Sequence, residues 1–215
     1  MAFYQRVSDR SNFVISWTFD PKNDFGVFAQ GYTSAANRLA STLLEASRFS
    51  DYDAYPVVFL YRHALELSLK HVIYRCAQLG ALRHIEKIGN ELYNNHHLPK
   101  LMNAAAASLE LLFPNDALLS SLIPRCRLTC DELTAIDPDS FAFRYPMDRK
   151  GRHSTAKHLV LNLSSFCQHM SPLLEELDTV HFGLSGEIDI AEDALYMAIH
   201  SQFQSTGEPC GEEDT

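Results

Sequence analysis

The feature that most constrains how this chain folds is the run from Pro56 to Leu79. As an α-helix, this run would be apolar on most of its circumference. One stripe recurs at three- and four-residue steps: Val58, Tyr61, Leu65, Leu69, Val72 and Cys76. Side chains at this spacing share one face of an α-helix, and a second set widens that face: Leu60, Ala64 and Leu67. A helix that is apolar on most sides needs neighbours on most sides, so we predict that it lies inside a bundle.

Similar spacing predicts helices before and after this central run. The predicted helical segments are 24–46, 97–112, 115–136, 155–177 and 188–203. Gly80 and the sequence Asp137-Pro138-Asp139 are predicted helix stops. Pro124 is predicted to split or kink the segment that contains it, and Pro172 to kink its own segment, because proline removes a backbone hydrogen bond.

The two ends of the chain have a different pattern. Four apolar residues near the N-terminus alternate with the period of a strand: Phe13, Ile15, Trp17 and Phe19. The C-terminal sequence STGEPCGEEDT is acidic and poor in apolar residues, as in disordered segments. We therefore predict an all-α protein with one helical-bundle domain over residues 1–204, an extended arm at 1–24 and a disordered tail at 205–215.

Composition limits the classes of partner. The formal net charge of −9 opposes nucleic acid at long range, so any contact with RNA must come from a local basic patch. No apolar run reaches the roughly 18 residues that a membrane helix needs, and we predict no membrane contact. The five cysteines are scattered and follow no signal peptide, which is typical of reduced thiols in a cytoplasmic protein.

Three charged residues stand on the central helix at i, i+4 and i+8, namely Arg62, Glu66 and Lys70. Two interpretations follow from this spacing. The three can form an exposed ion-pair ladder, which contributes a few tenths of a kcal/mol per pair. Alternatively, a half-buried Arg62 and Lys70, held by the carboxylate of Glu66, present fixed positive charge to a phosphate or to a partner subunit.

A second candidate site is the loop SFAFRYPMDRKGRH, residues Ser140 to His153, which contains the most basic patch of the chain. Its cations are Arg144, Arg149, Lys150 and Arg152, and its aromatic residues are Phe141, Phe143 and Tyr145. Rings beside arginine suit base stacking combined with phosphate contact, whereas the alternative is that the Phe residues hold the loop to the core. We expect Arg144, with Tyr145 beside it, to contact a phosphate or to pair with Glu66.

The sequence predicts neither a metal nor a cofactor. Cys126 and Cys130 share a helix face, but no further Cys or His stands at a usual zinc spacing nearby. The glycine patterns that bind nucleotide phosphates and the serine turn of hydrolases do not occur in the chain.

Three stretches together resemble bacterial proteins of the higher eukaryotes and prokaryotes nucleotide-binding (HEPN) class. They are Tyr55 to Lys70, His97 to Leu101, and Phe143 to Pro146 with Asp148 and Gly151, and the resemblance extends over roughly Gly31 to Leu177. It implies an antiparallel helical bundle that often forms homodimers. Active members of the class are metal-independent RNases of toxin-antitoxin and anti-phage systems, and inactive members bind nucleotides or RNA. A partner protein such as an antitoxin is therefore also expected.

The RNases of that class carry an Arg followed, after four to six residues, by a His near a helix start. Here Arg152 and His158 match the spacing and are the predicted catalytic residues. His would act as a base near neutral pH, while Arg would bind the phosphate. Two alternatives stay open: an exposed basic turn without catalytic function, and a non-catalytic interaction module that dimerises through helix faces and the line of Arg62, Glu66 and Lys70.

Overall fold

The structure is a computed structural model that describes residues 24–48, 50–85, 95–138, 140–148, 150–155 and 159–205. Its elements in chain order are α1 (Asp24–Glu45), a short 3-10 helix η1 (Asp51–Asp53), α2 (Ala54–Leu82), α3 (Leu98–Leu112), α4 (Ala117–Ile136) and α5 (Leu163–Ser205). No strand occurs within these ranges, where the one β-bridge joins Met147 to His153. The prediction of an all-α protein is confirmed.

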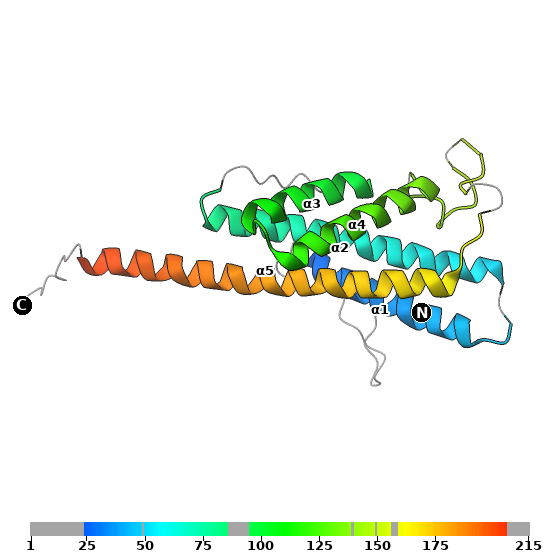
Figure 1. The fold of residues 1–215 in the computed structure, drawn as a ribbon, viewed down its shortest axis with the longest axis horizontal. Coiled ribbons are helices and arrows are strands. Elements are labelled where there is room, and N and C mark those ends of the chain that lie inside the picture. Colours follow the sequence, from blue (N-terminus) through cyan, green and yellow to red (C-terminus); the bar gives the residue numbers. More distant parts are fainter. Residues whose placement is uncertain are drawn as a thin grey trace, which may run out of the picture.

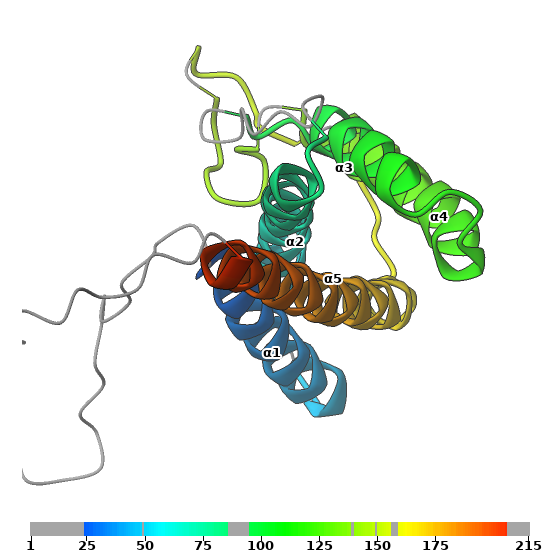
Figure 2. The ribbon, with the colours of Figure 1, turned by 90° about the vertical axis from the view of Figure 1, so that its left-hand side faces the viewer.

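Helix α2 is the central element of the bundle, as its apolar circumference predicts. Figure 2 looks along the bundle and shows α2 with α1 and α5 on one side and α3 and α4 on the other. Tyr61, Leu65 and Leu69 are almost completely buried. Gly80 does not end the helix, which continues to Leu82, and Gly80 itself is buried. The chain leaves the helix instead at Arg83 and His84, the latter with a φ of 57°.

Two helical hairpins account for four of the described helices. Helices α1 and α2 are antiparallel, since Asn37 contacts Tyr61 whereas Tyr32, nearer the start of α1, contacts His63. Helices α3 and α4 form the second hairpin (Figure 1). Pro124 does not split α4, because the helix runs through it. Pro124 is exposed, so the backbone carbonyl that loses its partner faces solvent.

The longest element, α5, differs most from the prediction. Two helices were expected at 155–177 and 188–203, but the structure has one 43-residue helix that begins at Leu163 and contains Pro172. Core residues continue across the expected break: Leu177, Val180, Leu184 and Ile188. Their burial against the bundle outweighs the low helix propensity of Gly183 and Gly186.

Helix α5 runs parallel to α2 along its length. Its contacts with α2 advance in the same direction on both helices: His181 with the Ser68 carbonyl, Ser185 with Arg75, and Glu192 with Gln78.

The predicted extended arm (1–24) lies, apart from Asp24 at the start of α1, outside the described residues, as does nearly all of the predicted tail (205–215). No helix in the described part of the chain is long and apolar enough to cross a membrane.

Candidate functional site

Arg62, Glu66 and Lys70 form a buried ion network inside the bundle. Their relative exposures are 2%, 1% and 4%. Lys70 Nζ lies 2.8 Å from Glu66 Oε1, and Arg62 Nη1 lies 3.4 Å from Glu66 Oε2. The interpretation as an exposed ladder is therefore wrong, because the charged atoms are enclosed by other parts of the chain.

The network joins three separate parts of the fold. Arg62 Nη1 donates a 2.6 Å hydrogen bond to Ser140 Oγ, and Nη2 donates to the carbonyl of His96 at 3.3 Å. The imidazole Nδ1 of His96 lies 2.8 Å from Glu66 Oε1. Arg62 also lies beside the carboxylate of Asp137 at the end of α4. Helix α2, the residues before α3 and the start of the 140–155 loop thus meet at one buried cluster.

The electrostatics of this cluster keep Glu66 charged. Burial acts to raise the pKa of the Glu66 carboxyl, but hydrogen bonds and positive charge from Lys70 and His96 outweigh it, so its pKa lies below the ordinary value. Removal of one member of such a buried network leaves the opposite charge of its partner buried and unpaired, which destabilises the fold.

The 140–155 loop is fixed to α2 at its beginning. Asp137 Oδ1 accepts hydrogen bonds from the backbone N–H groups of Phe141 and Ala142, at 2.8 and 2.9 Å. Phe143 is buried with Ala142 against Val58 of α2. The alternative in which Phe residues hold the loop to the core is confirmed for Phe143.

Arg144 is the most unusual exposed residue of the loop, because its guanidinium lies among three aromatic rings. The distances from Cζ to the ring centroids are 5.1 Å for Phe141, 5.6 Å for Phe59 and 5.8 Å for Tyr145. Its Nε donates a 2.8 Å hydrogen bond to the carbonyl of Ser140. Arg144 does not pair with Glu66, whose carboxylate is occupied by the buried network.

The surroundings of Arg144 continue onto α2. His63, half-buried, stacks on Phe59 with ring centroids 5.6 Å apart. Burial lowers the pKa of His63, the carboxylate of Glu66 opposes this, and the positive charges of Lys70 and Arg144 lower the pKa further. The ring of Phe59 therefore contacts both His63 and the guanidinium of Arg144.

Arg152 lies at the outer end of the loop, in a turn organised by Asp148. The Oδ1 atom of Asp148 accepts hydrogen bonds from the backbone N–H groups of Lys150 and Arg152, and Arg152 Nε donates to Oδ2 at 2.8 Å. Gly151 has a φ of 72°, a conformation that favours glycine. The hydrogen bonds from Arg152 lower the pKa of the Asp148 carboxyl. His158, the predicted catalytic partner of Arg152, lies outside the described residues.

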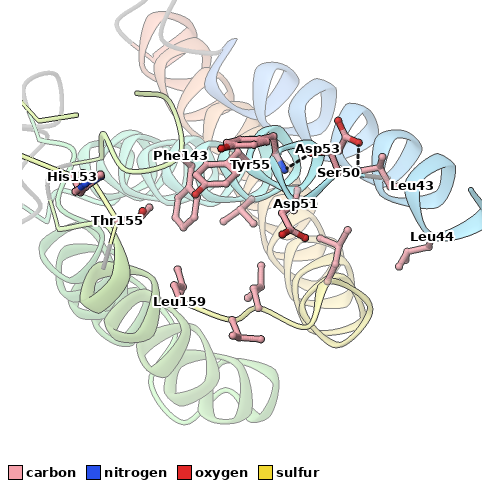
Figure 3. Close-up of a pocket in the computed structure, with 16 residues that line it drawn as sticks. Leu43, Leu44, Ser50, Asp51, Asp53, Tyr55, Phe143, His153, Thr155 and Leu159 are labelled. Atoms are coloured by element: carbon pink, nitrogen blue, oxygen red, sulfur yellow. Dashed lines mark hydrogen bonds between the residues drawn. The ribbon is translucent and has the colours of Figure 1, made fainter. Parts of the chain in front are cut away.

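A cavity of about 630 Å³ lies beside the loop (Figure 3). Its wall includes Tyr52, Tyr55 and Phe143, whose rings contact one another in sequence at 6.2 and 6.0 Å. His153 and Thr155 of the loop face it from one side, and Asp51 and Asp53 of η1 from the other. Thr155 and Leu159, which bracket the undescribed segment containing His158, both line it.

Sequence patterns did not identify three members of the buried cluster: His96, Asp137 and Ser140. Asp137 was interpreted only as a helix stop, although an acidic residue directly after an apolar helix, before Pro138, was the available signal. His96 and Ser140 reach the cluster through loop conformation, which periodicity does not predict. Within the described residues, no group of three or more His, Cys, Asp or Glu side chains is placed to hold a metal ion.

Charge is distributed unevenly along the chain. All 18 lysines and arginines lie before residue 158, whereas 11 of the 27 acidic residues lie after it. The negative net charge therefore belongs to α5 and the residues that follow it, not to the part that carries the 140–155 loop.

Comparison of the chain with family models, curated proteins and solved structures finds no match.

Proposed function

We propose that the chain is a HEPN-like protein that binds RNA or a nucleotide through the 140–155 loop. The observation that supports this most directly is the position of Arg144 among Phe59, Phe141 and Tyr145. Such an arrangement offers a base a ring or guanidinium plane to stack on, and offers its phosphate a cation. Tyr145 is 52% exposed and is the ring available for stacking.

The electrostatics of the loop support the same proposal. Arg144, Lys150 and Arg152 are exposed on one short segment, in the part of the chain that carries every lysine and arginine. Phosphate affinity depends on such local cations rather than on the net charge of the whole protein. The acidic α5 would reduce the rate of long-range association without removing the local site.

Arg62, Glu66 and Lys70 have a positioning role in this proposal. Their charged groups are buried and paired with one another, with His96 and with the start of the loop. A phosphate therefore meets Arg144 first, while Arg62 holds Ser140 and with it the backbone that presents Arg144. A loop fixed before binding loses less conformational entropy on binding.

The enzymatic form of the proposal is a metal-independent endoribonuclease of a bacterial toxin-antitoxin or anti-phage system. Arg152 and His158 would carry the cleavage, with His158 as base and Arg152 on the phosphate, and a homodimer would bring the pairs together. Arg152 would exchange Asp148 for the phosphate when RNA binds. An antitoxin or another defence protein would then be the regulatory partner.

The binding proposal is tested by fluorescence anisotropy with a labelled single-stranded RNA in EDTA. Arg144→Ala and Tyr145→Ala are expected to weaken binding by about tenfold each, the effect of one lost stacking or charge contact. Arg127→Ala is the matched control, because Arg127 is an exposed arginine on α4 whose guanidinium bonds to Asn103. Equal affinity of the wild type and both loop variants would exclude the loop as the binding element.

The nuclease form is tested separately with the same RNA over longer incubation. Cleavage in EDTA that Arg152→Ala and His158→Ala both abolish supports it, and sedimentation of the wild type tests the homodimer. Binding without cleavage leaves a non-enzymatic RNA- or nucleotide-binding protein. If the protein neither binds nor cleaves the RNA, the result favours the alternative function, a non-catalytic helical interaction module.

A further inference from the structure

The C-terminal third of α5 extends beyond the other helices (Figure 1). Its last contacts with the body are the ion pair between Glu187 and Arg83 and the hydrogen bond between Gln78 and Glu192. Ile188 is the last core residue, and every residue from Glu192 to Ser201 is exposed. Beyond Glu192, no residue up to Ser201 has a hydrogen bond, ion pair or ring contact with another described helix.

The exposed part of α5 is nevertheless apolar. Residues 194–199 read Ala-Leu-Tyr-Met-Ala-Ile, and the four large side chains among them are between 44% and 69% exposed. Ile190, one turn earlier, is 66% exposed. A helix that is apolar around its circumference is normally buried. Residues 190–201 therefore have the composition of a segment that packs against a partner.

Charge indicates what kind of partner this is. Asp189 and Asp193 are exposed beside the apolar residues, and neither side chain has a charged or hydrogen-bonding partner within the described residues. From residue 158 to the end the chain has no lysine or arginine. Pairing of this segment with the same segment of a second copy would bring the same carboxylates together, which costs energy, whereas a surface with lysine or arginine around an apolar centre would neutralise them.

We propose that residues 190–201 of α5 are a docking segment for a different protein, whose binding surface is apolar at its centre and bordered by lysines and arginines. The apolar residues of α5 supply the buried contact, and Asp189 and Asp193 select a basic partner. This inference is independent of RNA binding by the 140–155 loop, which lies on another part of the fold.

The probe for this surface is a helical peptide of about 18 residues, with leucines on one face and lysines around them, long enough to cover the exposed turns. The matched peptide has glutamate at every lysine position. The full-length protein should bind the Leu/Lys peptide and not the Leu/Glu peptide. Amide hydrogen exchange should become slower at residues 193–201 only when the Leu/Lys peptide is present.

Variants separate docking from general attraction between an acidic protein and a basic peptide. The double variant Leu195→Ser, Met197→Ser should weaken binding by about tenfold or more, because two large side chains lose their burial. Asp189→Asn with Asp193→Asn should weaken binding less and should reduce its dependence on salt. Leu128→Ser is the control, since Leu128 is a 59% exposed leucine on α4.

Two results would overturn the proposal. In the first, the Leu195, Met197 variant binds the Leu/Lys peptide as strongly as the wild type does. Binding would then be due to general attraction between the acidic protein and the basic peptide. The second is a wild-type protein that sediments as a dimer and becomes monomeric in that variant, which makes a second copy the occupant. Circular dichroism of the variant confirms that the bundle is intact.

Discussion

Arg62 Nε of α2 lies 3.2 Å from the Oδ2 atom of Asp137, the residue that ends α4. The Nε–H donates no hydrogen bond within the described part of the chain, so the contact is ionic. The other carboxylate oxygen of Asp137 binds the backbone N–H groups of Phe141 and Ala142. One buried carboxylate thus neutralises an arginine and also begins the loop that carries Arg144.

Substitution of Asp137 should therefore affect both stability and the loop. We predict that Asp137→Ala lowers the free energy of unfolding by about 3 to 5 kcal/mol, because Arg62 stays buried without this counter-charge. The measurement is urea denaturation followed by circular dichroism. RNA binding by the folded fraction should also weaken, because Arg144 follows the released backbone.

The control for this substitution is an exposed ion pair of the same type. Arg125 and Glu176 join α4 to α5 at the surface. Glu176→Gln should lower the free energy of unfolding by about 1 kcal/mol or less, because solvent already screens the pair. Equal losses in the two variants would contradict a special role for the buried contact between Arg62 and Asp137.

The sequence predicts most of the fold because apolar periodicity is a local property. It identifies the start of α1, the central position of α2 and the extents of α3 and α4 to within a few residues. It fails at Gly80, a predicted helix stop, and across residues 178–187, which lie between two predicted helices. Burial of Leu184 and Ile188 against the bundle decides the structure of α5, and such long-range packing is not visible in local spacing.

The candidate site is less predictable than the fold. The i, i+4, i+8 spacing shows that Arg62, Glu66 and Lys70 interact, but not whether they face water. Their burial depends on Asp137 and Ser140, far away in the sequence. The aromatic residues beside Arg144 in the sequence predict ring contacts for Phe141 and Tyr145, whereas the contact with Phe59 depends on where the loop crosses α2.

A buried histidine pair predicts that the protein loses stability in mild acid. His71 and His181 are in contact, with ring centroids 4.6 Å apart, between α1, α2 and α5. Burial lowers the pKa of His71 to about 3, and the nearby charges of His181 and Arg75 act in the same direction. Burial also lowers the pKa of His181, although the Ser68 carbonyl and the nearby carboxylate of Asp178 act against it.

The sign of the pH effect follows from proton binding. The unfolded chain takes up a proton on His71 near pH 6.5, whereas the folded protein does not, so stability present above that pH is lost as the pH falls. We predict a loss of about 2 kcal/mol from this residue between about pH 7 and pH 5. His71→Leu should flatten the dependence of the urea midpoint on pH, whereas substitution of exposed His153 to Asn should not.

The buried cysteines should be unreactive in the folded protein. Burial raises the pKa of the Cys76 and Cys126 thiols to about 12, so almost no thiolate forms near neutral pH. We predict that iodoacetamide at about pH 8 leaves both unmodified in buffer and modifies both in urea, as read by mass spectrometry of the peptides. Rapid modification of Cys126 without denaturant would contradict the packing of α4 against the core.

The salt dependence of RNA binding tests which cations contact phosphate. If Arg144, Lys150 and Arg152 each neutralise one phosphate, the logarithm of the binding constant should fall with the logarithm of salt concentration with a slope of about −2. Arg152→Ala should reduce the magnitude of that slope by about 0.7, because one fewer counterion is released. Arg127→Ala should leave the slope unchanged. An unchanged slope in Arg152→Ala would mean that Arg152 keeps its contact with Asp148 when RNA binds.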